Sequence, residues 1–102
     1  MSDLRTINRV TVYADSMLSD SLIEQFLALG SKGYTVIGCA GQGEHRAVDD
    51  PFGPASKFVR IELLVPPPVA DRIMHYLKTH ERRQRSIAMC VEDVKVLADE
   101  NF

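Results

Sequence analysis

Two short segments of this sequence carry residue types that bind anionic ligands. Gly41-Gln42-Gly43 ends an apolar, β-rich segment, and the basic run Arg82-Arg83-Gln84-Arg85 follows a segment with helical spacing. Glycine lets the backbone approach a ligand closely because it has no Cβ, and guanidinium groups bind phosphate in bidentate fashion. Each pattern also has a plainer interpretation: a strand-end turn for the glycines and a solvated helix end for the arginines. The basic run is nevertheless suited to meet a phosphate.

The histidines and cysteines form no recognisable metal or catalytic pattern. His45, His75 and His80 lack a metal-ligand spacing such as His-x-x-x-His, and Cys39 and Cys90 each lie in an apolar stretch without a nearby cysteine. We therefore predict two buried free thiols, and neither a disulfide nor a zinc site. The sequence also offers no nucleophile elbow and no acidic cluster of the kind found in active sites, so we do not expect an enzyme.

Length and charge limit the protein to a few classes. The 102 residues suffice for one domain, residues 1–102, and a content of 45% hydrophobic and 25% charged residues is typical of a folded globular protein. A net charge of -2 argues against a nucleic-acid-binding protein, which usually presents a basic face. Residues 1–10 lack the apolar core of a signal peptide, and no apolar run approaches the roughly 20 residues that span a bilayer. We expect a cytoplasmic protein.

Strand and helix patterns alternate along the chain. Ser19, Asp20 and Ser21 are candidate N-caps, with Ser21 and Glu24 at capping-box spacing, and the apolar residues after them predict a helix that ends before Gly30. A second helix is predicted to follow the prolines at 66–68. β-branched and aromatic residues predict strands at 9–14, 34–40, 58–65 and 87–91, with a short fifth strand at 94–97. Residues 44–56 show no periodicity and contain several turn formers, which predicts a long loop of the kind that is often functional.

Two strand-helix-strand units in succession predict an α+β, ferredoxin-like fold, in which an antiparallel four-stranded sheet carries both helices on one face. The second and fourth strands then lie at opposite edges of the sheet, which keeps Cys39 and Cys90 too far apart to pair. Val12, Ile37 and Ile61 are too apolar to leave a whole sheet face in water, so we expect an oligomer to bury the face opposite the helices.

The order of several sequence segments resembles that of PII signal transduction proteins. Gly33-Tyr34-Thr35-Val36, followed by Gly41-Gln42-Gly43, is similar to the second strand and the entry of the signalling loop in that family. Residues 59–66 are similar to the third strand and the proline that ends it, and residues 91–96 to the fourth strand and its exit. The resemblance covers nearly the whole chain and agrees with the fold inferred from the residue pattern.

The resemblance implies a homotrimer with an adenine-nucleotide cleft at each subunit boundary and a flexible T-loop, here residues 44–56, that touches a membrane transporter or another target. Thr35 would hydrogen-bond the edge of the adenine, and the backbone of Gly41-Gln42-Gly43 would approach the nucleotide closely. Leu64 and Tyr13, which fall on adjacent strands, would line the base or the ribose.

The phosphate end departs from the nitrogen regulators of this family. Those proteins carry a glycine-rich loop ending in lysine, whereas this chain has Glu81-Arg82-Arg83-Gln84-Arg85-Ser86 at the equivalent connection. Their two arginines near the C-terminus fall at about Ala98 and Glu100 here. Arg85, with Arg82 or Arg83 and with Arg46, would have to replace those contacts. Fewer phosphate contacts predict a shorter ligand, ADP or AMP rather than ATP.

The predicted T-loop is shorter than in the nitrogen regulators and contains no tyrosine. It is similar in this to PII-like proteins encoded beside inorganic-carbon transporters and carboxysomes, which sense adenylates together with bicarbonate. Such a transporter or another carbon-concentrating protein would be the regulated partner. Bicarbonate is a small planar anion that Arg46, Arg60 or the backbone N–H groups from Gln42 to Glu44 would receive. A CutA-like or metal-tolerance trimer, which shares the architecture but binds a divalent metal, is the alternative.

Overall fold

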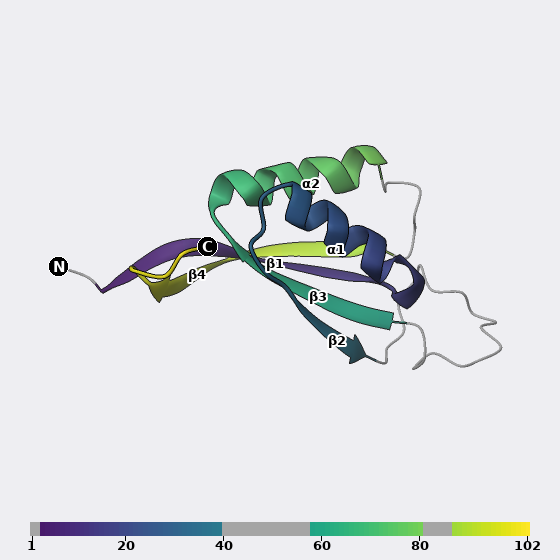
Figure 1. Cartoon of the computed structure of the whole chain (residues 1–102), viewed down its shortest axis with the longest axis horizontal. Helices are drawn as coiled ribbons and strands as arrows, with labels where there is room; N and C mark the ends of the chain where they lie inside the picture. The colour runs from purple at the N-terminus through teal and green to yellow at the C-terminus, as the bar shows by residue number, and fades with distance from the viewer. Residues whose placement is uncertain (1–2, 40–57, 81–86) are drawn as a thin grey trace.

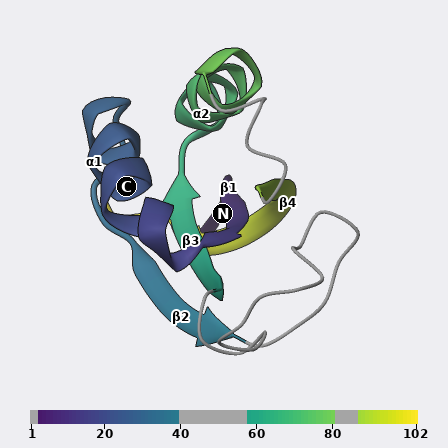
Figure 2. The ribbon, with the colours of Figure 1, turned by 90° about the vertical axis from the view of Figure 1, so that its right-hand side faces the viewer.

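Both helices lie on the same face of a four-stranded antiparallel sheet in the computed structural model, which describes residues 3–39, 58–80 and 87–102 (Figures 1 and 2). The elements in chain order are β1 (Leu4–Asp15), the 3₁₀ turn η1 (Ser16–Leu18), α1 (Ser19–Ala28), β2 (Thr35–Cys39), β3 (Phe58–Val65), α2 (Pro67–His80) and β4 (Ala88–Leu97). The strands are arranged as β2-β3-β1-β4. The predicted ferredoxin-like α+β fold is confirmed.

The core lies between the sheet and the helices. Alternate residues of β1 and β3 point toward the helices, and a stripe along each helix covers them. The buried members of this cluster are Val10, Val12, Ala14, Leu22, Phe26, Val59, Ile61, Leu63, Val65, Val69, Ala70, Ile73 and Leu77. Helix α2 begins inside the proline run, where the N–H groups of Val69 and Ala70 donate to the carbonyl of Pro66. A proline in the first turn lacks an N–H that would have no partner there, so the run starts the helix instead of breaking it.

The end of α1 behaves as its sequence predicts, whereas the residue that caps its start does not. Gly30 follows the helix with a φ of +121°, a backbone conformation that residues with a side chain rarely adopt. The helix begins at Ser19, in the predicted region, but its N-cap is Leu18 and none of the three predicted caps. A preceding turn sets this boundary, because the Asp15 carboxylate accepts a hydrogen bond from the N–H of Met17 and so caps η1.

β1 and β4 are both longer than predicted because they pair with each other. The register joins Leu4 to Leu97 at one end and Tyr13 to Ala88 at the other. The polar residues in the middle of β4 remain in the strand, because the carboxylates of Glu92 and Asp93 accept hydrogen bonds from Arg9 and Asn8 on β1. The prediction of two separate strands over 87–97 was therefore wrong, and one continuous strand runs from Ala88 to Leu97.

The register also corrects the prediction of an apolar open face. Val12 and Ile61 are cross-strand partners that point toward the helices and are fully buried in the core. Ile37 instead pairs with Arg60 and lies on the opposite face, which we call the open face. The open face carries apolar side chains, among them Ile7, Ile37 and Leu64, interspersed with polar and charged residues.

The cysteines lie on the two edge strands, as predicted, Cys39 on β2 and Cys90 on β4. Both are free thiols. The prediction that both cysteines are buried is wrong in the single chain, where Cys39 is half-buried and Cys90 is exposed. Edge strands leave one side of each residue without a neighbouring strand, which accounts for their exposure.

Candidate functional site

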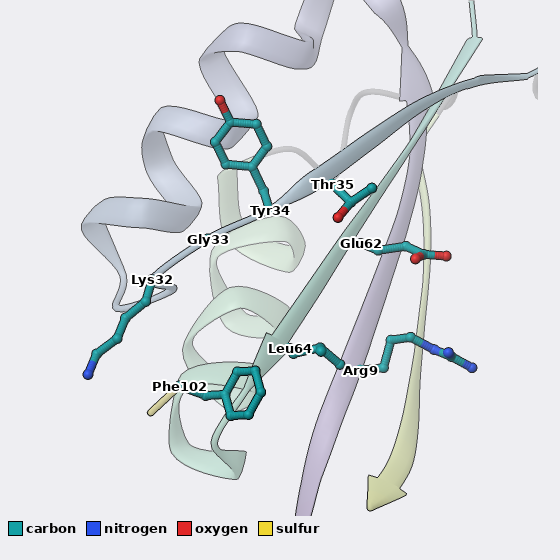
Figure 3. A pocket seen from close by; sticks show the side chains of 8 residues that line it. All are labelled: Arg9, Lys32, Gly33, Tyr34, Thr35, Glu62, Leu64 and Phe102. Atoms are coloured by element: carbon teal, nitrogen blue, oxygen red, sulfur yellow. The ribbon is translucent and has the colours of Figure 1, made fainter. Parts of the chain in front are cut away.

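A pocket of about 290 Å³ lies on the open face, at the start of β2 (Figure 3). Its walls come from β1, from β2 and the residues that lead into it, from β3 and from the last residue of the sequence. The lining residues are Arg9, Lys32, Gly33, Tyr34, Thr35, Glu62, Leu64 and Phe102. Thr35 and Leu64, which the sequence nominated on separate strands, thus line the same pocket.

The strand register brings the polar and apolar lining groups together. Thr35 on β2 is the direct cross-strand partner of Glu62 on β3, so both side chains stand on the open face (Figure 3). Leu64 lies two residues further along β3 and therefore on the same face, opposite Arg9 of β1. The pocket combines a hydroxyl that donates and accepts with an acceptor carboxylate and an exposed leucine. These groups suit a flat ring with polar edges.

Ion pairs define the charge around the pocket. Arg9 donates from Nε and Nη2 to one oxygen of Glu92, at 3.1 Å and 3.0 Å. That hydrogen bond, and then the charge of Glu92, raises the pKa of Arg9 above its usual value. Glu62 lies close enough to Arg9 to add to this effect. Lys32 provides a second cation at the pocket wall (Figure 3).

Arg60 lies beside the pocket and not in it. Its Nε is 3.2 Å from an oxygen of Glu62, two residues along the same strand. The N–H is not aligned for a hydrogen bond, and among the described residues this Nε has no hydrogen-bond partner. The guanidinium therefore orients the Glu62 carboxylate by charge. Arg60 itself is still more than one-third exposed.

Tyr13 is placed away from the pocket. It is the cross-strand partner of Arg60, whereas Leu64 is opposite Arg9, four residues away along each strand. At about 3.3 Å per residue this separation is roughly 13 Å. Tyr13 and Arg60 lie toward the end of the sheet where β2 ends, β3 begins and β4 begins. Of the three residues predicted to contact the base, Thr35 and Leu64 therefore line the pocket and Tyr13 does not.

Other predicted residues lie outside the described part of the chain. They are Gly41, Gln42, Gly43, Glu44, Arg46, Arg82, Arg83 and Arg85, together with the predicted T-loop at 44–56. Their roles stay predictions.

Several lining residues were not nominated from the sequence. Glu62 and Arg9 lie on strands that were correctly located, but only the register shows that they face Thr35 and Leu64. Phe102 lies at the pocket because hydrogen bonds with Asp3, Arg5 and Lys32 hold residues 98–101 in place. These partners are distant in the sequence, so no local sequence pattern predicts the contacts. Tyr34 belongs to the Gly33-Tyr34-Thr35-Val36 segment and Lys32 directly precedes it, so this segment was a signal that could have nominated both.

A second cavity, of about 390 Å³, lies over the helices and contains none of the predicted site residues. It is lined by Leu29, Asp71, Arg72, His75, Tyr76 and His80. The rings of Tyr76 and His80 stack there with centroids 4.8 Å apart. Within residues 3–39, 58–80 and 87–102, no three histidine, cysteine or acidic side chains are grouped so as to hold a metal ion. The helices in these residues are too short or too polar to cross a membrane.

Comparison with known proteins places the chain in a family. The model of the family "Nitrogen regulatory protein P-II" matches residues 7–101. A PII-like signaling protein from Thermus thermophilus is 30% identical, with a TM-score of 0.78 and 94% of each chain covered. No curated protein matches by sequence.

Two structures of CPII from Thiomonas intermedia K12 share the fold at lower identity. One, bound to ADP, AMP and acetate, is 18% identical with a TM-score of 0.78, covering 93% of this chain and 92% of CPII. The other, bound to ADP, AMP and bicarbonate, is 19% identical with a TM-score of 0.76, covering 91% and 94%. The match over residues 7–101 and the relative at 30% identity show that this chain belongs to the P-II family of signalling proteins.

Proposed function

We propose that the chain is a non-enzymatic regulatory protein that binds an adenine nucleotide, ADP or AMP, with its base in the pocket on the open face. The observation that carries the proposal is the meeting of Thr35, Glu62 and Leu64 in one pocket. Adenine presents an amino donor and ring acceptors on its edge, which a carboxylate and a hydroxyl complement. Leu64 contacts the flat face of the base. The structures of CPII with ADP and AMP support this choice of ligand.

The size of the pocket supports a site for the base and not for the whole nucleotide. Its 290 Å³ is at the lower end of the roughly 300 to 1,000 Å³ typical of small-molecule sites. The phosphates would extend along the open face past Arg60, toward the end of the sheet where segments 40–57 and 81–86 join the described strands. Segment 81–86 contains Arg82, Arg83 and Arg85.

A homotrimer would complete the site. Binding pockets usually bury at least 70% of a ligand, and a nucleotide lying on the open face of one chain would leave its outer side in water. A second copy packed against this face would cover the nucleotide and the exposed side chains of Ile37 and Leu64. Three copies related by rotation make each boundary identical.

The proposal has two further parts: the protein binds bicarbonate as a second ligand, and it regulates a partner protein. Arg60 is a cation beside the pocket whose side chain is more than one-third exposed, so its guanidinium could attract a small anion even though its Nε is buried beside Glu62. The CPII structure that holds ADP and bicarbonate supports such a pair of ligands. The loop at 44–56 would carry the signal to a cytoplasmic target, such as the cytoplasmic side of an inorganic-carbon transporter.

Thermal-shift assays and titration calorimetry test this proposal. The ligands are AMP, ADP and ATP, each with and without bicarbonate, and Mg²⁺ and Zn²⁺ without nucleotide. We expect ADP or AMP to stabilise the protein by about 2.7 kcal/mol at 100 times the dissociation constant. Bicarbonate should change the affinity for ADP. Stabilisation by a metal ion without any response to nucleotides would instead favour the metal-binding alternative.

A further inference from the structure

The last residues of the sequence, 98–102, fold back along the ribbon formed by the start of β1 and the end of β4 (Figure 1). Three hydrogen bonds of 2.7 Å anchor this segment, which we call the strap. They run from the N–H of Ala98 to the carbonyl of Asp3, from Nη2 of Arg5 to the carbonyl of Glu100, and from Nζ of Lys32 to Oδ1 of Asn101. The strap thereby joins the sheet to the residues that lead into β2.

The anchors bring the side chain of Phe102 to the pocket. Its ring lies near Leu64, at the end of the pocket away from Tyr34 (Figure 3). The guanidinium carbon of Arg5 lies over the same ring, 5.9 Å from its centroid. Arg5 therefore occupies one face of the ring and favours the position of Phe102 through a cation–π contact. Phe102 itself lines the pocket, whereas Arg5 is not among the lining residues.

We infer that Phe102 stacks on the base of the bound nucleotide, and that the strap holds the ring in position for this contact. This inference rests on the proposed function, and it adds Phe102, which lies after the last strand, to the nucleotide site. An aromatic ring against a nucleobase adds affinity, yet it distinguishes poorly between bases because every base has a π face. Phe102 thus sets the strength of binding, while Thr35 and Glu62 read the polar edge of the base.

Two of the three hydrogen bonds that anchor the strap are made by side chains at the protein surface. Its two side-chain hydrogen bonds, from Arg5 and from Lys32, are exposed to solvent, and such bonds contribute little to stability. A base stacked on Phe102 adds a contact that exists only while these hydrogen bonds hold the strap against the sheet, the state that we call closed. Nucleotide binding and closure of the strap therefore favour each other.

Tryptophan fluorescence reports directly on this contact, because the chain has no tryptophan. Phe102→Trp introduces a single indole at the pocket, and we expect ADP to change its emission with the same dissociation constant that calorimetry gives. Met74→Trp is the matched control, since Met74 lies on α2 on the helical side of the sheet, is 41% exposed and is not among the residues that line the pocket. Its emission should not respond to ADP. An unchanged signal from Phe102→Trp at saturating ADP would contradict stacking.

Calorimetry measures the contribution of the ring. Phe102→Ala should weaken ADP binding between about fivefold and a hundredfold, and Phe102→Tyr should restore most of the affinity. The loss should be similar for AMP and ADP, because the ring contacts the base and not the phosphates. Asn101→Ala, which removes one anchor and no pocket residue, should produce a smaller loss of the same kind. Circular dichroism confirms that each variant is folded.

The outcomes separate this inference from the proposed function. If wild-type protein binds ADP and Phe102→Ala binds it equally well, the role of Phe102 is wrong and the proposed function stands. If Phe102→Ala binds ADP more tightly than the wild type, the ring blocks the base instead of stacking on it, which also overturns the inference. If wild-type protein binds no adenine nucleotide, the proposed function and the inference both fail.

Discussion

Replacing Thr35 by valine tests the role of a single hydroxyl in the pocket. Thr35 stands on β2 opposite Glu62, and its side chain is exposed in the chain. Valine has nearly the same shape and is also β-branched, so it keeps the preference for an extended strand. Thr35→Val should therefore change the free energy of unfolding by no more than about 0.5 kcal/mol, as is usual for surface positions.

The expected loss of affinity follows from hydrogen bonding. If the Thr35 hydroxyl bonds to the edge of the base, valine leaves one polar atom of the base buried without a partner. Leaving such an atom unsatisfied costs about 1–3 kcal/mol. This corresponds to a weakening of ADP binding between roughly fivefold and 150-fold. A neutral hydrogen bond in a partly open pocket should fall in the lower half of that range.

Titration calorimetry with ADP on the wild type, Thr35→Ser and Thr35→Val measures the effect. Serine retains the hydroxyl, so Thr35→Ser should bind within a few-fold of the wild type. Denaturant unfolding at one fixed protein concentration checks that stability is unchanged, because an oligomer's stability depends on concentration. Binding by Thr35→Val that equals that of the wild type would refute the proposed contact between Thr35 and the base.

Two further predictions concern the scaffold that positions the pocket. Ile73→Ala removes a fully buried side chain from the centre of α2 and should lower the free energy of unfolding by about 2–5 kcal/mol, as measured by urea denaturation; a loss below about 1 kcal/mol would contradict its place in the core. Gly30→Ala should cost at least about 1 kcal/mol, because φ is +121° and the new Cβ would lie 3.1 Å from Cγ2 of Val69. An unchanged melting temperature for Gly30→Ala would show that the turn after α1 can relax.

Local patterns were sufficient for the elements whose boundaries depend on local chemistry. β3 runs over Phe58–Val65 as predicted, because β-branched residues alternate up to the prolines that end the strand. The same prolines start α2, and Gly30 ends α1 through its positive φ. Each of these signals acts within a few residues of the boundary, so each can be read from the sequence.

Boundaries that depend on pairing between distant segments could not be predicted in this way. Leu4 belongs to β1 only because it pairs with Leu97, more than 90 residues away. The acidic residues of β4 weaken its strand pattern, and Asn8 and Arg9 on the neighbouring strand compensate by bonding to them. Propensity describes a residue in isolation, whereas a cross-strand partner changes its energy.

The sequence by itself determined the ferredoxin-like order of elements and the resemblance that nominated Thr35 and Leu64. Only the tertiary structure decided which residues share a face and a pocket. Register placed Val12 and Ile61 in the core, set Glu62 beside Thr35, and left Tyr13 further along the sheet. The physical reason is the two-residue period of a strand: alternation separates the side chains into two sets, but which set meets the helices depends on how the strands pair.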